Sequence, residues 1–434
     1  MKYFKYVAII LVLIFSYGSK GYEAGQKTPP YYKLVVAGLN NRLSNNVSDF
    51  PYSAYIDKEI EHFRHIWGLK GVSVAIVKND RLVYAHGFGI AGDNQATVTP
   101  GNVFRVASVS KLITAVAIMK LVEDDKLSLE DFVFGPDGII RDSILDHVRD
   151  KRIYKITVRD LLAHAGGWTL RLGDPAFNSL RIAKIVGDLP PATISTYYKY
   201  IAAKRLSFNP GTRSVYSNMG YMFLGEVIRT AAGEPYESYI EKNILIPNGI
   251  VDMHIGNTYR KNKFPNEVQY YEQEESLKVH EYNGSGNMVE RSNGGNPIDL
   301  LSSAGGWVCS AVEMAKLITL IDGESGTHDI LSRRSVREMT DHTYAKGPLG
   351  WKSTFANGDW YRTGSMAGTS AMIKKQRDGL TWVFLSNTST WKGYKLAADI
   401  NRMMTRMTSR VKNWTGTDLF KYYPIDSLSV ADSL

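Results

Sequence analysis

One serine and one lysine of this chain are spaced so that they could act as a nucleophile and its base. Ser108 and Lys111 stand three residues apart, and two helical residues at that spacing share a face. A lysine amine can take the proton of a serine hydroxyl when burial keeps the amine neutral. Residues 112–122 are nearly all apolar, which predicts a helix buried on every side. The motif S-x-x-K also occurs by chance, so its place at the mouth of a buried helix gives it its weight.

A tyrosine and an asparagine downstream could supply two further functions. Tyr216 and Asn218 follow a Pro-Gly turn at 210–211, so a loop can direct both side chains toward a cleft. A tyrosine hydroxyl can relay a proton, and an asparagine amide can hold an amide or ester carbonyl. The Y-x-N spacing carries almost no information when taken alone.

A third polar stretch precedes a predicted hairpin in the C-terminal part of the chain. It consists of a cation, a hydroxyl, a glycine and a second hydroxyl: Arg362, Thr363, Gly364 and Ser365. A fixed cation at this point could bind a carboxylate or polarise the site. A glycine permits the close approach of a substrate backbone.

Several other conspicuous residues are interpreted as structural. His62 and His65 could share a metal ion, but no third ligand follows them, and an exposed helix face is the simpler interpretation. His164 lies in a pattern that ends a helix. Cys309 precedes a helix-capping pattern and is expected to be a small buried hydrophobic residue. The sequence therefore predicts no metal site and no cofactor.

The elements that would position these residues come from both ends of the chain. A helix is expected to begin at Ser53, as its N-cap, and to end at Gly68. Strand-like runs flank two turn signals and predict two hairpins: 72–77 with 81–88, and 369–374 with 380–385. A second amphipathic helix follows, while residues 100–330 have a mainly helical pattern. The predicted fold class is α+β, with one antiparallel sheet built from both chain ends, flanked by helices and interrupted by a mainly helical region.

Composition and the N-terminal segment narrow the function classes. The chain has 434 residues, of which 44% are hydrophobic and 22% charged, which argues against a disordered chain and a multi-span membrane protein. The net charge of +9 is dispersed, which indicates a mildly basic surface rather than a nucleic-acid-binding one. Lys2 and Lys5 precede an unbroken apolar run at 7–15, the pattern of a secretory signal peptide. The protein is expected to be periplasmic or secreted, with an uncleaved inner-membrane anchor as the alternative.

Taken together and in this order, the three motifs resemble those of the serine β-lactamase and penicillin-binding-protein family. The resemblance is to the branch of class C β-lactamases, D-Ala-D-Ala carboxypeptidases and related esterases. Segments 156–164, 304–307 and 349–351 are similar to that family as well. The expected organisation is a signal peptide, a lead-in, a hydrolase domain and a tail: 1–21, 22–52, 53–410 and 411–434.

The resemblance implies a role for each candidate residue. Ser108 would be acylated, and Lys111 would help to deprotonate it. Tyr216 would relay the proton to the leaving group, and Asn218 would hold the acyl side. The backbone N–H groups of Ser108 and Ser365 would form the oxyanion hole. The family usually has lysine or histidine where this chain has Arg362, and an arginine that keeps its proton can serve only as a fixed charge or a hydrogen-bond donor.

The predicted function is hydrolysis of an amide or ester, favouring peptides with D-residues or peptidoglycan-related substrates. Two alternatives remain open: a carboxylesterase with the same catalytic residues, and a penicillin-binding sensor that is acylated without turnover. The expected partner is a small molecule or a peptide, with no nucleic acid and no stable membrane span after removal of the signal. Fold and motifs are shared across these activities, so the sequence does not name the substrate.

Overall fold

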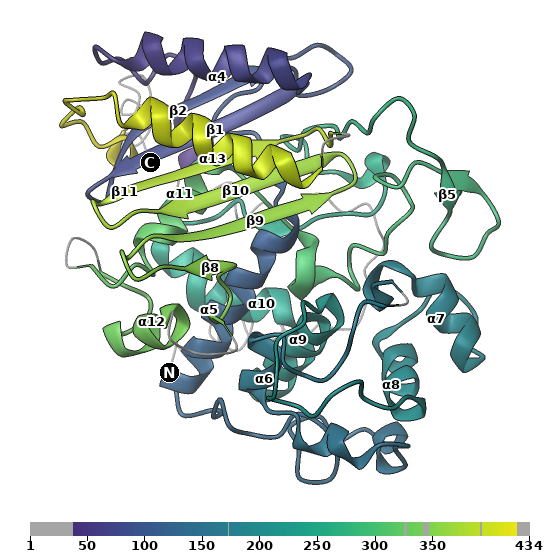
Figure 1. Ribbon diagram of the computed structural model, residues 1–434. Coiled ribbons are helices and arrows are strands. Elements are labelled where there is room, and N and C mark those ends of the chain that lie inside the picture. Colours follow the sequence, from purple (N-terminus) through teal and green to yellow (C-terminus); the bar gives the residue numbers. More distant parts are fainter. Residues whose placement is uncertain (1–37, 172, 325–327, 342–346, 391–392, 423–434) are drawn as a thin grey trace, which may run out of the picture. The chain divides into compact units, whose positions relative to one another are not determined.

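The computed structural model describes residues 38–171, 173–324, 328–341, 347–390 and 393–422. Its largest element is a six-stranded antiparallel sheet with the order β2-β1-β11-β10-β9-β8 (Figure 1). The strands are β1 (Gly71–Lys78), β2 (Arg81–Gly89), β8 (Ser353–Thr354), β9 (Trp360–Met366), β10 (Thr369–Lys375) and β11 (Leu380–Ser386). Two strands come from the N-terminal part of the chain and four from the C-terminal part. The predicted α+β fold with a sheet built from both ends is confirmed.

Both predicted hairpins form, and one long-range pairing joins them. In the first turn, Asn79 and Asp80 have φ angles of 50° and 60°, as a two-residue turn between twisted strands requires. Strand β1 pairs with β11 from Val72 opposite Ser386 to Lys78 opposite Leu380. This central pairing connects the N-terminal hairpin to the C-terminal one.

Two helices from opposite ends of the chain cover one face of the sheet (Figure 1). They are α4 (Ser53–Trp67) and α13 (Tyr394–Thr408). Gly68 ends α4 in the left-handed conformation, with φ of 63°, as predicted. The prediction of Ser53 as the N-cap is wrong by one residue. Ser53 N already donates to Phe50 O at 2.9 Å in the preceding turn, so Ser53 is the first helical residue and Tyr52 is the N-cap.

The other face of the sheet carries the inserted region, which is mainly helical as predicted. Its helices are α5 (Ser110–Glu123), α6 (Val158–Leu162), α7 (Ser179–Val186), α8 (Ile194–Ala203), α9 (Asn218–Ala232), α10 (Tyr236–Ile240) and α11 (Ala311–Thr319), and α12 (Arg333–Thr340) follows. Short strands that the sequence pattern did not indicate also occur: β3 (Phe104–Arg105), β4 (His254–Ile255), β5 (Val279–His280), β6 (Met288–Val289) and β7 (Trp307–Cys309). Residues 110–119 of α5 are all buried, which confirms the buried helix after Ser108.

The segments that flank the domain pack more closely than a surface lead-in and a peripheral tail would. A short helix, α3 (Leu39–Arg42), begins the described chain. The side chains of Asn45 and Ser48 accept hydrogen bonds from backbone N–H groups of β2, and Asp418 accepts a third. Leu419 is buried. An edge strand has backbone groups that no neighbouring strand pairs. These side chains provide hydrogen-bond partners for three of the backbone N–H groups of β2.

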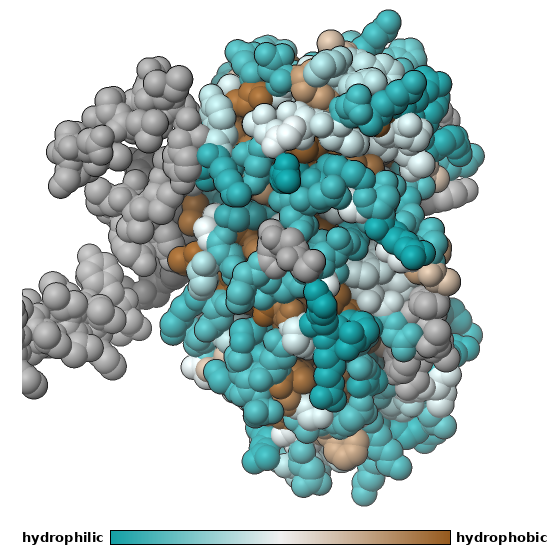
Figure 2. All heavy atoms as spheres, turned by 90° about the vertical axis from the view of Figure 1, so that its left-hand side faces the viewer, coloured by the Kyte–Doolittle hydropathy of each residue, from teal (hydrophilic) through white to brown (hydrophobic). Residues whose placement is uncertain are grey.

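The predicted signal peptide at 1–21 lies outside the described residues. Among the helices that the structure describes, none has the length and apolar character needed to cross a membrane. On the face shown in Figure 2, hydrophilic residues predominate and hydrophobic ones form small separate patches. Such scattered hydrophobic residues are normal for a protein surface.

Candidate active site

Ser108 lies in a tight turn immediately before helix α5. Residues Ala107–Val109 form a 3₁₀ turn, η1, and Ala107 has a φ of 46°, in the left-handed region that alanine rarely adopts. The helix begins at Ser110, so Lys111 lies in its first turn. The two residues therefore meet across a turn–helix junction rather than along one helical face. Lys111 Nζ lies 3.3 Å from Ser108 Oγ.

Lys111 is enclosed by hydrogen-bond acceptors. The residue is 0% exposed, and its Nζ donates to Asn218 Oδ1 at 2.6 Å and to the carbonyl oxygen of Ala304. A neutral amine has two N–H donors and one lone pair. Those two donors are satisfied by Asn218 and Ala304, which leaves the lone pair for the hydroxyl of Ser108. In its neutral form, Lys111 can accept the proton of Ser108 from this position.

Tyr216 approaches Ser108 from the loop before α9. Its hydroxyl lies 2.7 Å from Ser108 Oγ. Burial, reinforced by the nearby Arg362 cation, lowers the pKa of Lys111 to about 8. Burial alone would raise the pKa of Tyr216, but the cations of Lys111 and Arg362 outweigh it and lower this pKa to about 8 as well. The two groups titrate as a coupled pair, because the charge of each one shifts the pKa of the other.

Asn218 connects Lys111 to an aspartate that the sequence analysis missed. Asn218 begins α9, and its Nδ2 donates to Asp174 Oδ2 at 2.5 Å while its Oδ1 accepts from Lys111. The amide that was predicted to hold the acyl side is therefore engaged at both ends within the protein. Asp174 precedes Pro175 and caps a 3₁₀ turn, accepting from Ala176 N at 3.0 Å. An aspartate before a proline predicts the start of a helical turn. It gives no indication that Asp174 lies near Asn218 and Lys111.

Asp174→Ala should lower kcat/KM about 10- to 100-fold, because a hydrogen bond to a charged group contributes about 1.5–3 kcal/mol. The freed Asn218 amide can then rotate away from Lys111. Asp174 also raises the pKa of Lys111, so the acidic limb of the pH–rate profile should move to lower pH in the variant. Asp142 caps another 3₁₀ turn in the same way, accepting from Ile144 N at 2.9 Å. Equal losses in Asp174→Ala and Asp142→Ala would contradict a positioning role for Asp174.

Arg362 lies on β9 as predicted, but its guanidinium faces inward. The residue is 2% exposed, and its Nε donates to the carbonyl oxygen of Ser108 at 2.8 Å. The guanidinium carbon lies 6.0 Å from the centroid of the Tyr216 ring. Among the described residues, no carboxylate pairs with Arg362. The cation therefore holds the turn of the candidate nucleophile and acts on its neighbours through charge, and it offers little surface to a substrate carboxylate.

Gly364 allows β9 to lie against the turn that holds Ser108. A Cβ atom at this position would lie 2.1 Å from Val106 O and 3.1 Å from Ser108 N. The close approach that was predicted for a substrate backbone is made by the protein's own chain. Any larger residue would push the strand away from Ser108.

Thr363 and Ser365 place their backbone groups on the open edge of β9. The carbonyl of Tyr361 accepts from Lys352 N on the β8 side, at 3.0 Å. Backbone groups alternate sides along a strand, so the N–H of Ser365 points to that same side, away from β10. Strand β8 pairs with Trp360 and Tyr361, before the strand reaches Ser365. Strand β8 therefore offers this N–H no backbone partner in the described part of the chain.

The residues that were interpreted as structural have structural surroundings. His164 Nδ1 accepts from Ser217 N at 3.2 Å, and its ring centroid lies 4.5 Å from that of Tyr216. Burial lowers the pKa of His164 well below its usual range, so the ring is neutral and supports Tyr216 by packing. Cys309 is a buried free thiol on β7. The fixed charge of Arg362 lies close to Lys111 and Tyr216, and this charge disfavours a metal cation at the Ser108 site.

Comparisons with known proteins identify the family to which the chain belongs. The family model described as Beta-lactamase matches residues 56–403. An Escherichia coli protein named "Putative D-alanyl-D-alanine carboxypeptidase" is 29% identical over 192 residues, which cover 42% of this chain and 42% of that relative. The chain therefore spans less than half the length of this relative.

Two solved structures share the fold at low sequence identity. The penicillin-binding protein homologue from Pyrococcus abyssi has a TM-score of 0.58 and 22% identity, covering 87% of this chain and 80% of that one. The D-amino acid amidase from Ochrobactrum anthropi has a TM-score of 0.60 and 18% identity, covering 82% and 99%.

Proposed function

This chain belongs to the β-lactamase family of serine hydrolases, and from that premise we propose that it cleaves an amide or ester bond through an acyl-enzyme on Ser108. The contact of Ser108 Oγ with both Tyr216 and Lys111, at 2.7 and 3.3 Å, carries the proposal. A hydroxyl that contacts two groups able to accept its proton is equipped to act as a nucleophile. Peptides with D-residues are the favoured substrates, because a relative is named as a D-alanyl-D-alanine carboxypeptidase.

In the proposed acylation, the Lys111–Tyr216 pair takes the proton of Ser108 while Oγ attacks the substrate carbonyl. The backbone N–H groups of Ser108 and Ser365 donate to the oxygen that becomes negative. Tyr216 then donates a proton to the leaving amine or alcohol, and the C–N or C–O bond breaks. In deacylation, the pair takes a proton from water and returns it to Ser108 as the acid leaves.

A parallel turnover assay tests the substrate class. The panel contains a D-Ala-D-Ala peptide, a D-amino-acid amide, a short-chain nitrophenyl ester and nitrocefin. We expect the highest kcat/KM on one of the two D-residue amides. A preference for the ester would favour a carboxylesterase, and a stable penicillin adduct without turnover would indicate a sensor. Failure of every substrate and of a penicillin to acylate the folded protein would contradict the proposed function.

Arg362→Gln should move the acidic limb of the pH–rate profile to higher pH. Arg362 lowers the pKa of both Lys111 and Tyr216, so removing its charge raises both. The proposed base acts without its proton, and activity is lost as pH falls through its pKa of about 8. In the variant this loss begins at a higher pH, with about a tenfold loss at neutral pH per unit of pKa change.

Two further variants make the Arg362 result specific. Arg362→Lys keeps the positive charge but loses the planar guanidinium group. The acidic limb of its pH–rate profile should therefore lie close to that of the wild type. Arg377→Gln removes an exposed arginine from the β10–β11 turn and should leave the profile unchanged. The same profile in Arg362→Gln as in the wild type would exclude an electrostatic role for Arg362.

We also propose that the protein is exported with removal of its N-terminal segment. The support is the basic residues followed by the apolar run at 7–15. The mature chain should begin between about Ser19 and Tyr22, which N-terminal sequencing of the exported fraction would reveal. A full-length chain held in the inner membrane would show an anchor instead.

A further inference from the structure

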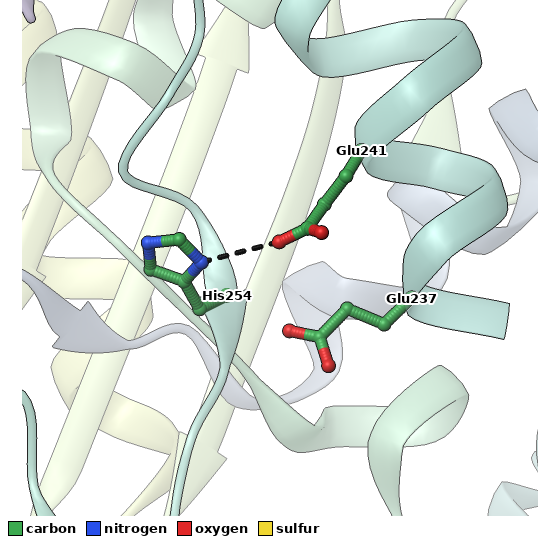
Figure 3. A group of neighbouring side chains, drawn as sticks. All are labelled: Glu237, Glu241 and His254. Atoms are coloured by element: carbon green, nitrogen blue, oxygen red, sulfur yellow. Dashed lines mark hydrogen bonds and ion pairs between the residues drawn. The ribbon is translucent and has the colours of Figure 1, made fainter. Parts of the chain in front are cut away.

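A second cluster of titratable side chains lies where helix α10 meets the short strand β4 (Figure 3). Glu237 belongs to α10, and Glu241 begins the π-helical turn η5 (Glu241–Leu245) that continues it. Residues four apart lie on one helical face, and His254 of β4 faces both carboxylates (Figure 3). One possible ligand atom of each residue lies within 4.8 Å of the others. We infer that Glu237, Glu241 and His254 bind a divalent metal ion of the zinc type.

The spacing within the cluster suits a single ion. His254 Nδ1 lies 3.2 Å from Glu241 Oε1. Two ligands of a tetrahedral zinc ion, each about 2.0–2.1 Å from the metal, are about 3.3–3.4 Å apart. Glu237 Oε1 accepts from Ile255 N at 2.6 Å, and its other oxygen has no hydrogen-bond partner among the described residues. The three ligand atoms all lie within 4.8 Å of one another, so a movement of the Glu237 carboxylate toward the other two would complete three protein ligands, with a fourth position open to water.

An outer layer of side chains orients the imidazole. His254 Nε2 lies 3.4 Å from Asp252 Oδ1. Asp252 Oδ2 in turn accepts from Asn40 Nδ2 at 2.8 Å and from Asn266 Nδ2 at 2.7 Å. Metal-bound histidines usually donate their second ring N–H to such a carboxylate, which fixes the ring. Asn40 is 5% exposed, and its Oδ1 has no hydrogen-bond partner among the described residues, so an unsatisfied buried oxygen belongs to this layer.

The charges of the cluster favour a cation. Four carboxyl groups gather around one imidazole, since Glu313 is buried and accepts from the backbone N–H of Asp252 at 3.2 Å. Protonation of His254 can supply one positive charge, whereas a divalent ion supplies two. Glu241 and Asp252 are partly exposed, at 23% and 24% of their side chains, which leaves an entry path for the ion. The cluster shares no residue with the Ser108 site.

Zinc titration of the chelator-treated full chain tests the inference, by calorimetry and by metal content after gel filtration. We expect one equivalent of Zn²⁺ for the wild type. Glu241→Gln and His254→Asn should each weaken binding at least tenfold, and Asp252→Asn about 10- to 100-fold, the usual effect of removing an outer partner. Circular dichroism checks the fold of each variant, and Glu241→Gln keeps the size of the side chain.

A histidine–glutamate pair elsewhere provides the matched control. On α4, His65 Nε2 lies 3.0 Å from Glu61 Oε1, and this exposed pair belongs to no group of three ligands among the described residues. Glu61→Gln with His65→Asn should leave zinc binding unchanged. The inference is overturned if the wild type binds no stoichiometric zinc, or if folded Glu241→Gln and His254→Asn bind it as the wild type does. In that case His254 acts as an imidazolium between Asp252 and Glu241.

Discussion

Ser108→Ala should lose turnover by on the order of 10⁴-fold or more while the protein remains folded. The substitution removes only Oγ, and with it the atom that would carry the acyl group. The turn itself is held through the backbone, because Arg362 Nε binds the carbonyl oxygen of Ser108 at 2.8 Å. A fluorophosphonate or penicillin probe should therefore add one adduct to the wild type and none to the variant, as measured by intact mass.

A remote serine gives the control for this experiment. Ser409 follows α13, and its hydroxyl donates to Arg406 O at 2.9 Å. Ser409→Ala should be labelled and should turn over substrate like the wild type. A folded Ser108→Ala protein with wild-type activity would end the acyl-enzyme proposal. Labelling of the variant at another serine would identify that serine, and not Ser108, as the nucleophile.

Lys111→Met should have the second largest effect, a loss of kcat/KM on the order of 10²–10⁴-fold, the usual contribution of a general base. Methionine fills nearly the same volume but cannot accept the proton of Ser108. The substitution also leaves Asn218 Oδ1 and the carbonyl oxygen of Ala304 without their donor. Each unsatisfied buried acceptor costs about 1–3 kcal/mol of folding free energy, so thermal unfolding must be measured beside the kinetics.

Lys120→Met separates the loss of a base from the loss of a lysine. Lys120 lies on the same helix and pairs with Asp124 at 2.5 Å near the surface. Its removal should cost little, because exposed ion pairs contribute about 0–1 kcal/mol. Wild-type activity in a folded Lys111→Met protein would show that Tyr216 alone can deprotonate Ser108.

The sequence predicted correctly those features that depend on neighbouring residues, and it failed where contacts between separate elements decide the structure. The hairpin at Asn79 and Asp80 was predicted because turn residues and alternating strands are local signals. The N-cap of α4 was predicted one residue too late. The backbone N–H of Ser53 donates to the carbonyl oxygen of Phe50, so the helix begins at Ser53 and its N-cap is Tyr52. The short strands β3 to β7 carry no clear pattern, since a pairing of two or three residues is decided by what packs around it.

Two clusters were beyond the reach of sequence reasoning. Asp174 lies 44 positions before Asn218, and nothing in its local turn points to that amide. His254 and Glu241 are 13 positions apart on a strand and a helical turn, a spacing that matches no common metal motif. Each contact exists because separate elements pack together, and pattern recognition along the chain cannot measure such proximity.

The sequence by itself determined the fold class, the family and the chemical types available at the site. It did so because the hydrophobic periodicity, the turn residues and the three motifs each depend on residues that are close together in the sequence. Only the tertiary structure decided what each group faces. It turned Arg362 inward onto the carbonyl of Ser108, filled the space beside Gly364 with the protein's own backbone, and engaged both ends of the Asn218 amide. These outcomes depend on distances between elements far apart in the chain. Burial then lowers the pKa of Lys111, and the cations of Lys111 and Arg362 lower that of Tyr216 against the effect of its burial.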